Sequence, residues 1–286
     1  MSSPQVVDIS YLIESYEALF FDSFGVLIDG IDALPGAVDL VDRMNRDGTN
    51  YSVVTNDASV SIQSRVKRFA SKGFDIPAKR IVNSGSLIAD CIIDSGLSGS
   101  PALVLGTDDA RDYTTAGGAI LVELEDEIEP DVVVVGHSGP HDWETTLEEL
   151  LALFSRRYRE GAPVKLVLPN PDLIYPNGPG IFGFGAAAFV NLLEQALERL
   201  HGSDDSLKAT RLGKPFAQIF ESAIKRAATR NVVMIGDQLE TDILGANRIG
   251  IPSAVVTTGI NRRTKGNEFN NVDQTLTPQY ILHSLV

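Results

Sequence analysis

Short apolar runs, often β-branched, alternate along this chain with longer segments in which apolar residues recur every three or four positions. The short runs lie at 18–21, 51–54, 102–105, 132–135, 164–168, 232–235 and 254–256. Helical periodicity marks the segment around Val38, Val41 and Met44, and longer segments at 142–159 and 186–200. This alternation is typical of a parallel sheet covered by helices, so the sequence predicts a doubly wound α/β fold.

The number of predicted strands bears on the number of domains. About ten strands with their helices exceed the usual size of one sheet, so the pattern favours two domains. The polar stretch from His201 to Ser206 is the predicted linker.

Composition narrows the class of protein. The 286-residue chain is 43% hydrophobic and 22% charged, which is enough apolar material for one large core or two moderate ones. Its formal net charge of −14 repels nucleic-acid backbones and anionic lipid surfaces, so neither partner is expected.

The N-terminus has no basic leader, and no apolar run approaches the ~20 residues that span a bilayer. We therefore expect a soluble, cytoplasmic protein.

Polar residues follow three of the predicted strands. Asp22 ends the first run, Thr55 and Asn56 end the second, and Asp237 follows the run at 232–235. Taken singly, each is an ordinary turn former or helix cap. Because the carboxyl ends of parallel strands form one edge of the sheet, where ligands bind, the residues together indicate a site.

The residue types at this edge suit phosphoryl chemistry. Gly25 permits a sharp turn that exposes Asp22 beyond its strand, and a carboxylate so placed can attack phosphorus. Asp22, Asp237 and backbone carbonyls offer the hard oxygen ligands that Mg²⁺ prefers, and Lys214 supplies a fixed cation. Thr55, Asn56 and nearby backbone N–H groups are candidates for holding phosphoryl oxygens.

Four segments, at 20–27, 53–56, 213–215 and 235–246, carry a resemblance to a known family. The sequence resembles the haloacid dehalogenase superfamily, and within it the NagD-like phosphatases with a large inserted cap. Segments 170–173, 175–176 and 183–186 resemble the cap of that subgroup, so the likeness covers nearly the whole chain.

The resemblance implies an organisation. A Rossmann-like core would comprise residues 1–86 and 206–286, and an α/β cap that sets substrate specificity would comprise 87–205. Caps of this kind often pair, so a homodimer through the cap is one expectation, although the sequence leaves the oligomeric state open. The substrate would be a small phosphorylated metabolite, with sugar phosphate, phosphoglycolate and pyridoxal phosphate all open.

The resemblance also implies roles for individual residues. Asp22 would be the nucleophile, Lys214 the charge-neutralising lysine, and Thr55 and Asn56 the phosphate holders. The residues implied for the metal site are Asp22, the backbone carbonyl of Phe24, and Asp237 for Mg²⁺, with Asp242 as an acid behind them. Asn170 and Asp172, on a cap loop, would contact the substrate.

One position departs from the family. Its phosphatases usually carry a second aspartate two residues after the nucleophile, as general acid and base, and this chain has Phe24 there. A phenyl ring moves no proton, and the loss of a positioned acid or base commonly costs ~100- to 10,000-fold in rate.

Three hypotheses accommodate Phe24. In the first, the chain is a phosphatase that acts slowly, prefers good leaving groups, or uses Asp29 or Asp57 as the acid. In the second, it is a dehalogenase-type hydrolase, since those enzymes carry an aromatic residue here, although they use no metal. In the third, it is a catalytically impaired protein that binds a phosphorylated ligand. The retained nucleophile, lysine and acidic motif favour the first.

Overall fold

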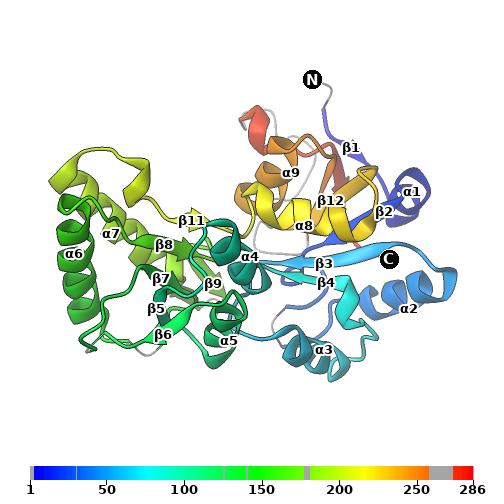
Figure 1. Cartoon of the computed structure of the whole chain (residues 1–286). Coiled ribbons are helices and arrows are strands. Elements are labelled where there is room, and N and C mark those ends of the chain that lie inside the picture. Colours follow the sequence, from blue (N-terminus) through cyan, green and yellow to red (C-terminus); the bar gives the residue numbers. More distant parts are fainter. Residues whose placement is uncertain are drawn as a thin grey trace. The chain divides into compact units, whose positions relative to one another are not determined.

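The computed structural model describes residues 3–29, 31–124, 126–139, 141–176, 181–257 and 273–285 (Figure 1). The chain divides into two compact units. The first comprises Met1–Thr55, Ile62–Asn83 and Lys214–Val286, and the second comprises Asn56–Ser61 and Ser84–Gly213. Among the described residues, no helix is both long and apolar enough to cross a membrane.

The first unit is built on a seven-stranded sheet with the strand order β1-β14-β13-β12-β2-β3-β4, in which every pair is parallel. Its strands are β1 (Gln5–Val6), β2 (Ala18–Phe21), β3 (Tyr51–Thr55), β4 (Ile81–Asn83), β12 (Val232–Gly236), β13 (Ser253–Val256) and β14 (Tyr280–Leu282). Strands β2, β3 and β12 are buried along their whole length, as expected for central strands of a parallel sheet. The predicted parallel α/β sheet is confirmed.

Helices cover both faces of this sheet, with α2 and α3 on one side and α8 and α9 on the other (Figure 1). The helical elements of the unit are α1 (Ile9–Ser15), α2 (Ala37–Asp47), α3 (Ile62–Ala70), α8 (Ala217–Ala227), α9 (Leu244–Arg248), the 3₁₀ turns η1 (Ala78–Arg80) and η5 (Gln274–Leu276), and the π-helical turn η4 (Leu239–Ile243). Val41 and Met44 of α2 pack with Leu19, Phe21 and Ile235 of the sheet in one apolar core, and Val38 packs partly buried against it. The apolar spacing that predicted this helix is therefore its buried face.

The second unit has its own five-stranded sheet, in the order β11-β8-β7-β5-β6 and again all parallel. The strands are β5 (Pro101–Leu105), β6 (Ile120–Val122), β7 (Val132–Val135), β8 (Lys165–Leu168) and β11 (Thr210–Arg211), with a separate antiparallel pair of β9 (Ile174–Pro176) and β10 (Phe182–Phe184). The helical elements are η2 (Ser84–Ser86), α4 (Leu87–Asp94), α5 (Asp108–Ala116), α6 (Trp143–Arg159), α7 (Ala186–His201) and η3 (Asp205–Leu207). Helices α6 and α7 pack with β7 and β8 in the core of this unit.

The limits of the second unit differ from the predicted boundaries at 87 and 205. Residues 56–61, 84–86 and 206–213, which the sequence placed in the core domain, belong to the second unit. The reason for the last stretch is β11, which pairs with β8 through Thr210↔Val167 and Arg211↔Leu168. The segment predicted as a linker, 201–206, lies within the second unit and connects the end of α7 to η3. A two-residue strand leaves no periodicity from which it could have been predicted.

A buried carboxylate ties β11 to α7. The Glu194 side chain, 9% exposed, accepts hydrogen bonds from the Ala209 backbone N–H at 2.6 Å and from both terminal nitrogens of Arg211 at 2.6 and 3.0 Å. We expect Glu194→Ala to lower the free energy of unfolding by about 2 kcal/mol, because it leaves a largely buried guanidinium without its carboxylate. Urea unfolding of the full chain measures this as a lower midpoint.

The matched control lies on the same helix. Glu198 pairs with Lys208, but the Glu198 side chain is exposed and that of Lys208 is only partly buried. Glu198→Ala should therefore change the stability by less than about 0.5 kcal/mol, because exposed ion pairs contribute little. Equal midpoints for the two variants would contradict the structural role of Glu194.

Candidate active site

Asp22 lies immediately beyond the central strand β2, between the ends of its two neighbours. The strand pairs with β12 on one side and β3 on the other, so Asp237, which follows β12, and Thr55, which ends β3, lie at the same edge. The Asp22 N–H donates to the Ile235 carbonyl at 2.9 Å, which extends the β2–β12 ladder to the aspartate. The Ser23 N–H donates to Asp22 Oδ1 at 2.7 Å and holds the carboxylate in place.

Lys214 bridges two carboxylates at this edge. Its Nζ lies 2.7 Å from Asp22 Oδ1 and 2.6 Å from Asp242 Oδ1, and the residue is only 1% exposed. Burial alone lowers the pKa of Lys214, but the charges and hydrogen bonds of Asp22 and Asp242 outweigh it and raise the pKa above its ordinary value. The ammonium is therefore a permanent positive charge beside Asp22.

Asp242 is held by hydrogen bonds from Lys214 and from the backbone. Its Oδ1 accepts from Lys214 Nζ at 2.6 Å, and its Oδ2 accepts from the Gln238 N–H at 3.2 Å. Burial raises the pKa of Asp242 to about 7; among its charged neighbours, Lys214 lowers this pKa and Asp22 raises it. The cluster thus contains more negative charge than Lys214 neutralises.

This excess of negative charge fits a divalent cation. Asp22, Asp237 and Asp242 each offer a carboxylate oxygen, and the three oxygens lie within 4.8 Å of one another. All three residues are buried: Asp22 is 6% exposed, and Asp237 and Asp242 are 0% exposed. Closely spaced hard oxygen donors in a buried position suit Mg²⁺.

Gly25 brings the backbone next to Phe24 close to the Asp237 carboxylate. It has φ +78°, and a Cβ atom built on it would lie 2.3 Å from Asp237 Oδ2. A side chain at this position would displace the Asp237 carboxylate, so only glycine permits the approach. The close packing fits a site completed by a backbone carbonyl of this turn.

The phenyl ring of Phe24 packs against the core beside α3. It is partly buried in the apolar cluster that includes Ile62 and Val66, and the Arg68 guanidinium carbon lies 5.5 Å from the centre of the ring. That distance is within the range of a cation–π contact. Sequence reasoning did not single out Arg68, because nothing in its spacing relates it to Phe24.

The other predicted binding residues form a second group, within the second unit. Asn56 Nδ2 donates to Asp172 Oδ1 at 2.8 Å, and the Asp172 N–H donates to Asn170 Oδ1 at 2.9 Å. The structure thus brings Asn56, Asn170 and Asp172 together, while Asp22, Thr55, Phe24, Lys214, Asp237 and Asp242 belong to the first unit.

The two substitute acids suggested by the sequence have other partners. Asp29 is exposed and accepts from the N–H groups of Asp32 and Ile31 at 2.8 and 2.9 Å. These hydrogen bonds lower the pKa of Asp29, which keeps it ionised and makes it a poor proton donor near neutral pH. Asp57 belongs to the second unit, where it accepts from the N–H and hydroxyl of Ser59.

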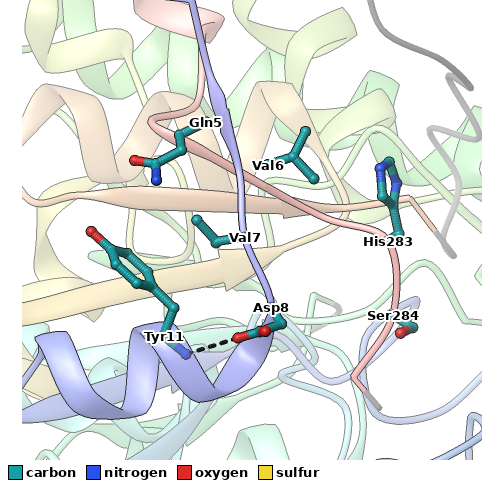
Figure 2. Close-up of a pocket in the computed structure, with 7 residues that line it drawn as sticks. All are labelled: Gln5, Val6, Val7, Asp8, Tyr11, His283 and Ser284. Atoms are coloured by element: carbon teal, nitrogen blue, oxygen red, sulfur yellow. Dashed lines mark hydrogen bonds between the residues drawn. The ribbon is translucent and has the colours of Figure 1, made fainter.

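A surface hollow of about 500 Å³ lies elsewhere, at the edge of the first sheet (Figure 2). It is lined by the strand β1, the start of α1 and the residues after β14. The hydrogen bond drawn there, from the Tyr11 N–H to Asp8, is the N-terminal cap of α1. The lining contains none of the predicted site residues, so we do not assign the chemistry to this hollow.

Comparisons with protein families agree with the geometry. Residues 19–119 match the family described as haloacid dehalogenase-like hydrolase, and residues 211–286 match the family described as HAD-hydrolase-like. Together the matches cover more than half of the chain. They contain Asp22 and the three residues grouped with it, Lys214, Asp237 and Asp242.

Curated relatives extend the likeness. The chain is 29% identical over 87% of its length to D-glycerol 3-phosphate phosphatase of Mycobacterium tuberculosis, and it spans 65% of that relative. It is 26% identical over 84% of its length to ribonucleotide monophosphatase NagD of Escherichia coli, and it spans 86% of that relative.

Solved structures show the same fold. A possible sugar phosphatase of the HAD superfamily from Cytophaga hutchinsonii superposes with a TM-score of 0.83 at 26% identity, covering 99% of both chains. The glycerol phosphate phosphatase of Mycobacterium tuberculosis in complex with magnesium superposes with a TM-score of 0.78 at 27% identity, covering 96% of this chain and 77% of that one.

Proposed function

The chain belongs to the haloacid dehalogenase-like hydrolases of the NagD-like group, and we propose that it is a Mg²⁺-dependent phosphatase of small phosphate esters with Asp22 as its nucleophile. The observation that carries this proposal is the contact of Lys214 with both Asp22 and Asp242, beside a carboxylate cluster that fits a divalent cation. The magnesium complex of a phosphatase with the same fold supports the cofactor.

The residues suit two successive displacements. An oxygen of Asp22 attacks phosphorus, a new P–O bond forms, and the bond from phosphorus to the ester oxygen breaks. Water then attacks the aspartyl phosphate, releasing phosphate and restoring the carboxylate. Asp22 and Asp237, with the Phe24 carbonyl, would hold Mg²⁺, which when bound neutralises phosphoryl charge. Lys214 holds Asp22 in place, Asp242 orients Lys214, and Thr55 and Asn56 bind phosphoryl oxygens.

Phe24 affects the leaving group. Without an acid at this position, the departing oxygen takes its proton from solvent, which is slow for an alkoxide but unimportant for a phenolate. We therefore expect a phosphatase in which phosphoryl transfer to Asp22, measured as kcat/KM, depends strongly on the leaving group. Hydrolysis of the aspartyl phosphate, which has lost its usual base, is the same step for every ester. A dehalogenase and a non-catalytic phosphate-binding protein remain the alternatives, but the named relatives are phosphatases.

A panel of phosphate esters tests the proposal. The panel contains the ester classes for which the relatives are named: glycerol 3-phosphate, a sugar phosphate and a ribonucleoside monophosphate. p-Nitrophenyl phosphate is added because its leaving group needs no proton. We expect phosphate release that requires Mg²⁺ and is lost with EDTA. The kcat/KM for p-nitrophenyl phosphate should exceed that for the alkyl esters by about 100-fold or more, the factor that a general acid usually supplies.

The alternatives predict other results from the same protein. A dehalogenase would release halide from a haloacid without metal. A binding protein would be stabilised by phosphate or by an ester without turnover. If no ester is hydrolysed with or without Mg²⁺, the phosphatase proposal is wrong.

Three further expectations stay proposals. The second unit would act as the cap that sets substrate specificity, and the protein would be cytoplasmic. It would also form a homodimer through the second unit. Large apolar side chains exposed on the β9–β10 pair, among them Ile174, Phe182 and Phe184, support such a contact.

A further inference from the structure

The segment that follows Thr55 is anchored in the second unit. The Ser84 hydroxyl donates to the Asn56 carbonyl at 2.7 Å in a buried position. Farther along, the Thr107 hydroxyl donates to the Ser59 carbonyl at 2.9 Å, and the Ser61 N–H donates to Asp109 at 2.8 Å. The backbone that carries Asn56 is therefore fixed by residues from η2 and from the start of α5.

The Asn56 side chain is fixed as well. Its Nδ2 donates to Asp172 Oδ1 at 2.8 Å. A Cβ atom built on Gly213 would lie 2.6 Å from Asn56 Oδ1 and 2.7 Å from Pro171, so Gly213 packs tightly on the other end of the amide. Since a carboxylate oxygen accepts and an amide nitrogen donates, this pairing sets which way round the amide lies. It also sets the direction of the second N–H on the same nitrogen.

Asp172 has a fixed position of its own. The Asn170 side chain accepts from the Asp172 backbone N–H at 2.9 Å, which holds the loop after β8 in one conformation. A carboxylate in direct contact with a phosphorylated substrate would repel it. The same carboxylate paired with an amide orients a neutral donor toward a phosphoryl group, and that role involves no such repulsion.

We propose that Asp172 is a positioning residue for Asn56, and that Asn170 positions Asp172 in turn. This replaces the expectation that Asn170 and Asp172 contact the substrate themselves, and it rests on the proposed role of Asn56 in holding phosphate. Through these two hydrogen bonds, the loop after β8 determines the orientation of the Asn56 amide, next to Thr55 in the sequence.

Four variants of the full chain test the assignment: Asp172→Asn, Asp172→Ala, Asn56→Ala and the double variant Asn56→Ala/Asp172→Ala. Asp172→Asn keeps a side-chain carbonyl that can still accept from Asn56, so it should keep kcat/KM within about threefold of the parent. Asp172→Ala and Asn56→Ala should each lower it by about 10- to 100-fold, mostly through a higher KM, as the loss of one oriented donor does. The double variant should be no worse than Asn56→Ala, because both changes remove the same hydrogen bond.

Other outcomes overturn the assignment. If Asp172→Asn is as damaging as Asp172→Ala, the charge of Asp172 acts directly, on the substrate or as an acid. If the two alanine changes multiply, the residues act independently. Thermal unfolding midpoints identify a variant that has merely lost its fold, and Asn170→Ala then provides a second test, with the same rise in KM expected.

Binding of inorganic phosphate separates this inference from the proposed function. Calorimetry in the presence of Mg²⁺ does not require turnover. If the parent chain hydrolyses no ester but binds phosphate, and Asp172→Ala and Asn56→Ala weaken that binding while Asp172→Asn does not, the phosphatase proposal fails and the positioning role stands. Equal phosphate binding in all variants, or none in the parent, overturns the positioning role.

Discussion

Asparagine in place of Asp22 should lower kcat for phosphate ester hydrolysis by at least about 10,000-fold, as the loss of a covalent nucleophile does. An amide oxygen does not form the aspartyl phosphate, and the substitution changes few atoms. The contact of Lys214 with Asp242 at 2.6 Å remains available, so the lysine is not left buried without a counter-ion. Phosphate release over hours, at high enzyme concentration, measures the residual rate.

Asp29→Asn is the matched control, because it makes the same chemical change at an exposed position seven residues further along the chain. The Asp29 side chain is exposed and its hydrogen bonds are local. This variant should keep its activity within about twofold, because an exposed side chain away from the cluster contributes little. If Asp29→Asn loses as much activity as Asp22→Asn, Asp29 is the missing acid; if Asp22→Asn keeps its activity, the nucleophile lies elsewhere.

Restoring an aspartate at position 24 should raise the rate on alkyl phosphates, but by less than a general acid usually supplies. Such an acid contributes ~100- to 10,000-fold, and we expect about 10-fold from Phe24→Asp alone. The reason is Arg68, whose guanidinium now lies over the phenyl ring. A cation that close to a new carboxylate lowers its pKa by ~1 to 3 units, so little of it carries a proton to donate.

Removing Arg68 as well should raise the rate on alkyl phosphates further. Phe24→Asp/Arg68→Gln is expected to hydrolyse glycerol 3-phosphate about 100-fold faster than the parent, since the aspartate then holds its proton more readily. The kcat/KM for p-nitrophenyl phosphate should gain much less in both variants, because this parameter reports phosphoryl transfer to Asp22, in which that leaving group needs no proton.

Arg68→Gln alone is the control for the double variant. It should leave the rate within about threefold, because the cation–π contact that it removes is worth only ~1 kcal/mol and lies outside the reacting groups. No gain in the double variant would mean that the site differs from its family in more than Phe24.

Part of the site could be predicted from the sequence. The apolar runs identified β2, β3 and β12, and the rule that ligands bind beyond the carboxyl ends of parallel strands placed Asp22, Thr55 and Asp237 at one edge. That inference needs only the local periodicity of each strand and the parallel direction that helical crossovers impose. The structure agrees with it, because β12, β2 and β3 are neighbours in the sheet.

The contacts on which the proposals rest depended on tertiary structure. Arg68 over Phe24, and Asp172 against Asn56 across 116 residues of sequence, join side chains that no spacing rule relates. The extent of the second unit depended on the pairing of the two residues of β11 with β8. Local periodicity determines which residues form a strand and which of its ends carries chemistry. Which distant side chains meet is decided only when each unit packs its own core. Burial stabilises the arrangement that fills space and satisfies polar groups, and that arrangement is a property of the folded unit.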